Sequence, residues 1–185
     1  MHSTGVKGEH LAPSFVQDFH PFGRIPVFDD DGTRFFESRA ICEYLVAKYG
    51  PKSALNRRTD QSYPELATYE QAASVEYSYF DPTMKTLAYE KLFKGFMGRG
   101  DPDKATVERL EIDLVKVLDH YEKVLSRREY LAGNQFSLVD IYHMPWFEFL
   151  PRLALQDEIT KRPALSAWWE RVSNRSTWKG LTASH

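Results

Sequence analysis

The first clear pattern of apolar and polar positions lies in residues 23–50, GRIPVFDDDGTRFFESRAICEYLVAKYG. Two short β-branched and aromatic runs, RIPVF and TRFF, flank the polar DDDG, which predicts a β-hairpin with a tight turn. Three aspartates also raise the question of a calcium loop, but such a loop needs ligands spread over about 12 residues and a closing Glu. Helical spacing then begins at Ser38, a good N-cap, and stops at Gly50 and Pro51.

From Lys52 onward the pattern predicts helices and a linker only. Residues 52–61 are polar, and apolar side chains from Leu66 to Leu87 then recur at gaps of three and four, which predicts a long amphipathic helix kinked at Pro82. A second run of the same period lies between residues 107 and 124.

The next signal is a helix start. Ser137 and Asp140 in SLVD match a capping box, and the segment after it is apolar on nearly all sides, which predicts a central helix bent at Pro145. The pattern ALSAWWERVSNRSTW predicts one final helix. The predicted fold class is therefore α+β to mostly α, with a mixed piece over residues 1–51, a linker over 52–61 and an all-helical domain over 62–185.

The composition of the chain limits the classes of function that are possible. The chain has 185 residues, a net charge of −2 and a pI near 6.3, and no run of Lys and Arg exceeds a pair. A nucleic-acid or anionic-membrane surface is not indicated. Cys42 is the single cysteine, so an intrachain disulfide is excluded, and its position inside a helix predicts a buried rather than a reactive thiol. We expect a cytoplasmic protein.

Glu37 and Ser38 form the first candidate site, because they stand where a strand ends and a helix begins. A helix N-terminus offers free N–H groups to an anion, and a carboxylate beside it accepts from an ammonium group. The pair is thus a plausible clamp for the head of an α-amino acid. The alternative is a simple cap and an exposed charge.

Pro26 is the second candidate, because proline cannot donate to a sheet and marks an edge strand or a cis bond. The backbone of Ile25 would then be free to pair with an extended peptide; an ordinary edge-strand proline is the alternative. A clamp for an amino-acid head and an edge that pairs with peptides together suggest a small peptide ligand.

The sequence resembles the glutathione transferases, with the phi-type class and its fungal relatives, including the nitrogen-regulator branch, as the nearest match. HPFGRIPVF followed by FFESRAICEYLVAKYG resembles the second half of the thioredoxin-like glutathione domain. YEKVLSRREYLAGNQFSLVDIYHMPW and RPALSAWWERVSNRSTW resemble the family's helical domain, so the resemblance covers essentially the whole chain.

The resemblance implies roles for individual residues. Pro26 would be a cis-proline, Ile25 would pair its backbone with the cysteinyl part of glutathione, and Glu37 and Ser38 would hold the γ-glutamyl head. Two more residues, Arg24 and His10, would lie near the glycyl carboxylate, although Leu11 stands where the family often has a lysine after this histidine.

Other residues have two interpretations. Tyr77, Phe80 and Met84 would line a pocket for the electrophile or pack in the core. Ser137 and Asp140 would be a capping box or a Ser/Asp catalytic pair. Three histidines, His20, His120 and His143, have no partners at ligand spacing and are interpreted as structural, and no metal site is expected.

The resemblance implies an enzyme that conjugates glutathione to small hydrophobic electrophiles in detoxification. Glutathione would be the co-substrate, and no other cofactor is expected. The enzyme would be a homodimer. The alternatives are a non-catalytic glutathione-binding dimer partner or regulator, and a scaffold that no longer binds glutathione.

A strand–helix–strand unit before the hairpin would need roughly 35–40 residues, whereas 22 precede Gly23. We therefore expect the unit that carries the family's catalytic Ser, Cys or Tyr to be missing, and the chain to be weakly active or inactive. The catalytic residue is unknown, with Ser3, Thr4 and Ser14 the first to test.

Overall fold

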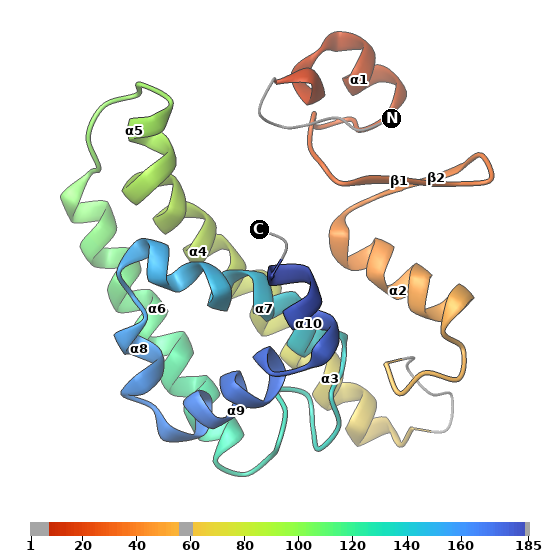
Figure 1. Cartoon of the computed structure of the whole chain (residues 1–185), viewed down its shortest axis with the longest axis vertical. Coiled ribbons are helices and arrows are strands. Elements are labelled where there is room, and N and C mark those ends of the chain that lie inside the picture. Colours follow the sequence, from red (N-terminus) through yellow and green to blue (C-terminus); the bar gives the residue numbers. More distant parts are fainter. Residues whose placement is uncertain (1–7, 56–60, 184–185) are drawn as a thin grey trace. The chain divides into compact units, whose positions relative to one another are not determined.

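The computed structural model describes residues 8–55 and 61–183 (Figure 1). Two compact units, residues 1–56 and 57–185, divide the chain. Residues 56–60, which are half of the predicted linker 52–61, lie outside the described residues.

The first unit is built on a two-stranded antiparallel sheet. A 3₁₀ turn, Glu9–Leu11, and helix α1, Pro13–Asp18, precede it. Strand β1, Val27–Asp30, pairs with β2, Thr33–Phe36, in the register Val27 to Phe36, and helix α2, Ser38–Tyr49, follows. The predicted hairpin is confirmed.

The hairpin turn follows from its sequence. Asp31 and Gly32 both have positive φ, 51° and 82°, as a type I′ turn requires, and this turn suits the twist of the flanking strands. Asp29 accepts the Gly32 N–H at 3.2 Å. The three aspartates thus belong to a turn.

Asp30 fixes helix α2 against the hairpin. Its Oδ2 accepts from Lys48 Nζ at 2.6 Å and from the hydroxyls of Tyr44 and Tyr49 at 2.7 and 2.8 Å. The hydrogen bonds from Lys48 and the two tyrosines lower the pKa of Asp30 from 3.8 to about 2. One carboxylate therefore joins the strand to three positions of the helix.

The second unit begins with one long helical segment. It comprises α3, Tyr63–Val75, a π-helical turn, Glu76–Phe80, α4, Asp81–Ala88, a second π-helical turn, Tyr89–Phe93, and α5, Lys94–Phe96. The predicted break at Pro82 takes the form of a π turn directly before it, in which the Asp81 N–H donates to the Glu76 carbonyl. Proline lacks the N–H that would continue the α-helical ladder at this point.

The remaining helices complete the second unit. They are α6, Lys104–Leu125; α7, Leu138–Phe149, followed by a 3₁₀ turn, Leu150–Leu153; α8, Asp157–Thr160; α9, Pro163–Ser173; and α10, Ser176–Thr182. The prediction of a single final helix is wrong, because two helices, α9 and α10, cover this segment. The Asn174 side chain donates to the Glu170 carbonyl at 2.8 Å, and Arg175 has extended backbone angles, so the helix ends and a new one starts.

Helix α7 is central, as predicted. It packs against α3, α4 and α9 (Figure 1), and Phe147 is 1% exposed. The capping box is confirmed, because the Ser137 side chain accepts the Asp140 N–H and Asp140 Oδ2 accepts the Ser137 N–H at 2.9 Å; the Ser137 hydroxyl lies 3.1 Å from the same oxygen. Asp140 Oδ1 also accepts from the Leu131 N–H and from Trp168 Nε1, at 3.1 and 2.9 Å. This fully buried carboxylate therefore joins α7 to a loop and to α9, while its burial raises its pKa.

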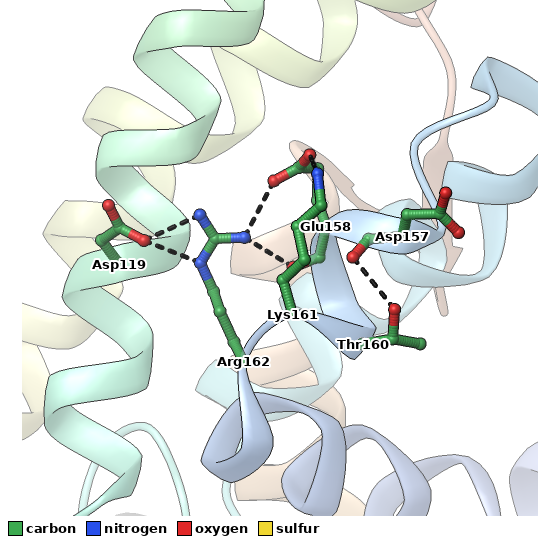
Figure 2. Close-up of polar contacts among 6 residues, drawn as sticks. All are labelled: Asp119, Asp157, Glu158, Thr160, Lys161 and Arg162. Carbon is green, nitrogen blue, oxygen red and sulfur yellow. Dashed lines mark hydrogen bonds and ion pairs between the residues drawn. The ribbon is translucent and has the colours of Figure 1, made fainter.

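Arg162 joins the corner between α8 and α9 to α6. Figure 2 shows its guanidinium between Asp119 and Glu158. It is 2.7 Å from Asp119 and 3.0 Å from the Glu158 carboxylate, and it donates to the Glu158 carbonyl at 2.6 Å. The Arg162 residue is only 7% exposed, so its charge is neutralised inside the unit.

Among the helices in residues 8–55 and 61–183, none combines the length and the apolar character that crossing a membrane requires.

Candidate functional site

The predicted ligand residues gather at the end of the hairpin opposite the turn. Val27 pairs with Phe36 as the last pair of the sheet, and Pro26 and Glu37 are the next residues of the chain beyond this pair. The Ile25–Pro26 bond is cis, as the resemblance implies. The pairing of the two strands therefore brings Ile25 and Pro26 to the same end of the hairpin as Glu37 and Ser38, although ten residues of chain separate the two pairs.

Glu37 has an unusual backbone conformation. It is the N-cap of α2, with φ 70° and ψ 112°, and its side chain makes no capping bond. Ser38, predicted as the cap, is instead the first residue of the helix. A non-glycine residue at such angles costs about 1–3 kcal/mol and is typical of ligand-binding positions.

Three side chains at this end have no side-chain partner in the part of the chain that the structure describes. Arg24, Glu37 and Ser38 are exposed, and none has a side-chain hydrogen bond or ion pair with another described residue. The first backbone bond into α2 is from the Ile41 N–H to the Glu37 carbonyl, at 3.0 Å. The start of α2 at Ser38 is therefore the positive end of the helix, where an anion is favoured.

His10 lies against the same segment. A Cβ on Gly23, whose φ is 59°, would come within 3.0 Å of the His10 carbonyl oxygen, so the chain before Arg24 packs closely on His10. The Nδ1 atom of His10 is buried and has no hydrogen-bond partner among the described residues. Buried polar atoms in proteins nearly always have a hydrogen-bond partner, so this nitrogen is an exception among the described residues.

His20, which the sequence predicts only as a structural histidine, packs between two segments next to the candidate site. It is 2% exposed, its Nδ1 accepts the Phe22 N–H at 3.2 Å, and its ring lies 4.6 Å from the ring of Phe36. These contacts tie the turn before Arg24 to the end of β2, next to Glu37. The sequence gives no local signal of this contact, because Phe36 is 16 residues away.

The three residues predicted for an electrophile pocket do not share one environment. Phe80 and Met84 are fully buried, and the Phe80 ring packs on His143 and Phe147 at 5.0 and 5.5 Å. Phe80 and Met84 therefore pack in the core and do not line an open pocket. Tyr77 is 63% exposed and lies on the first π-helical turn.

The other candidates are structural. The Asp140 carboxylate accepts from Ser137, Leu131 and Trp168, which favours the capping interpretation of Ser137 and Asp140 over a catalytic pair. His143 donates to the Val139 carbonyl at 2.7 Å and accepts the Tyr121 hydroxyl at 2.8 Å. Burial raises the pKa of the half-buried Cys42 thiol. No group of three or more His, Cys, Asp and Glu in the described part of the chain is arranged to hold a metal ion.

Comparison with known proteins identifies the family. The family model described as glutathione S-transferase, C-terminal domain, matches residues 39–176, and the corresponding N-terminal domain model matches residues 4–47. Glutathione S-transferase PM239X14 of Arabidopsis thaliana is 43% identical over 166 residues, which are 89% of this chain and 74% of that protein.

Solved structures agree. Glutathione transferase F7 of Populus trichocarpa superimposes with a TM-score of 0.87 at 30% identity, over 98% of this chain and 84% of that one. Glutathione S-transferase I of maize, in complex with an atrazine glutathione conjugate, gives a TM-score of 0.85 at 27% identity, over 99% and 83% of the two chains. The chain belongs to the glutathione S-transferase family.

Proposed function

We propose that the hairpin end formed by Ile25, Pro26, Glu37 and Ser38 binds glutathione for conjugation to an electrophile. The γ-glutamyl head carries an ammonium and a carboxylate side by side. Glu37 accepts from the ammonium, and the Ser38 hydroxyl and backbone N–H at the start of α2 donate to the carboxylate. The absence of other partners for these exposed groups in the described residues is the observation that supports this assignment.

The rest of the tripeptide follows the same edge. The Ile25 backbone, next to the cis bond, pairs with the cysteinyl part. Arg24 and the unpaired Nδ1 of His10 then bind the glycyl carboxylate. Because a carboxylate between an arginine and a histidine gains charge-assisted hydrogen bonds, both ends of the ligand are fixed and the thiol between them is positioned.

Conjugation forms a bond between the glutathione sulfur and the electrophilic carbon, and the leaving group departs with the bonding electrons. The thiolate is the nucleophile, and at a pKa of about 8.5 only about 3% of a free thiol is ionised at pH 7. The residue that activates the thiol is unassigned. Ser14 is exposed in α1, and Ser3 and Thr4 lie outside the described residues.

The maize relative with its atrazine glutathione conjugate supports a small hydrophobic electrophile as second substrate. Tyr77 remains the predicted residue for that substrate. We further propose a cytoplasmic homodimer, supported by the family and by the single cysteine.

The test is calorimetric titration of the full chain with glutathione and with cysteinylglycine, which lacks the γ-glutamyl head. We expect cysteinylglycine to bind at least about tenfold more weakly, because one charge-assisted hydrogen bond contributes about 1.5–3 kcal/mol. Equal binding of the two peptides, or no binding of glutathione, would contradict the proposal.

A further inference from the structure

His20 is buried in the first unit, between the two segments that carry the candidate ligand residues. Its side chain is 2% exposed. Its backbone is held on both sides, because its N–H donates to the Phe15 carbonyl of α1 at 3.1 Å and its carbonyl accepts the Gly23 N–H at 2.9 Å. A side chain on a backbone that is held in this way is a rigid support for the residues that it contacts.

The Nδ1 atom of His20 holds the turn that leads to Arg24. It accepts the Phe22 N–H at 3.2 Å, so the ring hydrogen is on Nε2. The same turn is packed on a further segment, because a Cβ on Gly23 would lie 3.0 Å from the His10 carbonyl oxygen. The direction of the Arg24 side chain depends on this turn, since Arg24 is the next residue of the chain.

The ring of His20 packs on the end of β2. The ring centroids of His20 and Phe36 are 4.6 Å apart, and the two planes are tilted by 41°. Phe36 is the last residue of β2 and belongs to the last pair of the sheet. Glu37 follows it directly, so the position of Glu37 depends on how Phe36 is held.

Phe35 is the matched comparison for Phe36. Successive side chains of a strand point to opposite faces of the sheet. The Phe35 ring packs on Tyr44 of α2, with the centroids 4.3 Å apart, whereas Phe36 packs on His20. Two adjacent phenylalanines of one strand therefore contact different partners.

We propose that His20 is a positioning residue of the glutathione site, holding Arg24 at the glycyl end through Nδ1 and Glu37 at the γ-glutamyl end through its ring. The role of His20 rests on the proposed function of the hairpin end. His20 acts through Phe22 and Phe36 and needs no contact with the ligand. One side chain then adjusts the site to the full length of the tripeptide.

Two substitutions of His20 separate its two contacts. His20→Asn keeps an acceptor, because the asparagine side chain bonds to the backbone N–H two residues further on, but it removes the ring. His20→Phe keeps a ring beside Phe36 but leaves the Phe22 N–H without its acceptor. Each variant is the control for the other.

The experiment is calorimetric titration of the full chain with glutathione and with two dipeptides. γ-Glutamylcysteine lacks the glycyl end, and cysteinylglycine lacks the γ-glutamyl end. We expect His20→Phe to weaken glutathione about fivefold, as for one lost hydrogen bond, and to leave γ-glutamylcysteine within about twofold of the parent. We expect His20→Asn to weaken glutathione about fivefold, as for one lost ring contact, and to leave cysteinylglycine within about twofold.

A second pair of variants gives the same test without changing His20. Phe36→Leu removes the ring that His20 contacts and should reproduce the pattern of His20→Asn across the three peptides. The control is Phe35→Leu, the same substitution on the opposite face of the strand. It should leave the affinity for glutathione within about twofold of the parent.

The outcomes distinguish this role from general support of the fold. If both His20 variants weaken all three peptides by the same factor, His20 only stabilises the unit and the inference is wrong. Equal effects of Phe36→Leu and Phe35→Leu would overturn it as well. If the parent chain does not bind glutathione, the proposed function itself is contradicted and the role of His20 falls with it.

Discussion

Charged groups have opposite environments at two places in this molecule. Arg162 in the helical unit is 7% exposed and has both carboxylate partners and a backbone carbonyl. At the hairpin end, Arg24 and Glu37 are exposed, and neither has a partner among the described residues.

The difference separates charges that hold the fold from charges that are available to a ligand. A buried ion leaves a large penalty when its partner is removed. An exposed, unpaired ion is solvated by water and contributes little to stability. The same residue types therefore act as structural links in one unit and as candidate ligand contacts in the other, and each of the following predictions tests that distinction.

Asp140→Ala should have the largest effect on stability. The substitution leaves the N–H groups of Leu131 and Ser137 and the indole N–H of Trp168 without their acceptor. Each buried donor without a partner costs about 1–3 kcal/mol, so we expect a loss of about 4 kcal/mol in the free energy of unfolding. Urea denaturation measures it, and a loss below about 1 kcal/mol would contradict the structural role of this carboxylate.

Arg162→Met should come next, with a loss of about 3 kcal/mol in the same measurement. Removing one partner of a fully buried pair costs about 3–5 kcal/mol, and the value here lies at the lower end because the Asp119 side chain is 55% exposed. The control is Lys161→Met, whose side chain is 61% exposed and pairs with the same Glu158. Its expected cost is below about 1 kcal/mol, and equal losses for the two variants would remove the distinction between buried and exposed pairs.

Asp30→Asn should change how stability depends on pH. The folded-state pKa of Asp30, about 2, lies below its ordinary value of 3.8. Its ionised form thus contributes stability above pH about 4, and the contribution disappears as pH falls toward about 2. The difference in unfolding temperature between the parent and Asp30→Asn should be constant from pH 5 to 7 and shrink below pH about 4. A difference that does not change with pH would mean that Asp30 is not held ionised by Lys48 and the tyrosines.

Glu37→Gln should have the smallest effect on stability, within about 0.5 kcal/mol of the parent. The exposed Glu37 carboxylate has no partner to lose in the described residues, and the backbone conformation is kept. A loss comparable with that of Arg162→Met would mean that Glu37 supports the fold.

Local chemistry made much of this fold predictable from the sequence. The turn at Asp31 and Gly32 and the cap at Ser137 and Asp140 each depend on residues within four positions of one another. The end of α9 at Asn174 was missed, because helical spacing continues through it and only the contact to Glu170 reveals the break.

Long-range contacts were not predictable in the same way. The helical period placed Tyr77, Phe80 and Met84 near one another but did not show that Phe80 and Met84 are buried while Tyr77 is exposed. The contacts of His20 with Phe36 and of Arg162 with Asp119 join residues 16 and 43 positions apart, for which a single sequence gives no signal. The candidate ligand residues were found because a motif marks them; the contacts that hold them in place were not.

The most direct test compares glutathione binding by two variants that each remove one exposed carboxylate from the same hairpin. Glu37→Gln changes the proposed ligand contact, whereas Asp31→Asn changes the turn at the opposite end, where asparagine tolerates the positive φ of 51°. By calorimetry we expect Glu37→Gln to weaken glutathione at least about tenfold, and Asp31→Asn to leave its affinity within about twofold of the parent. Equal affinities for the two variants would show that the unpaired carboxylate of Glu37 does not bind the ligand, and would contradict the assignment of this hairpin end to glutathione.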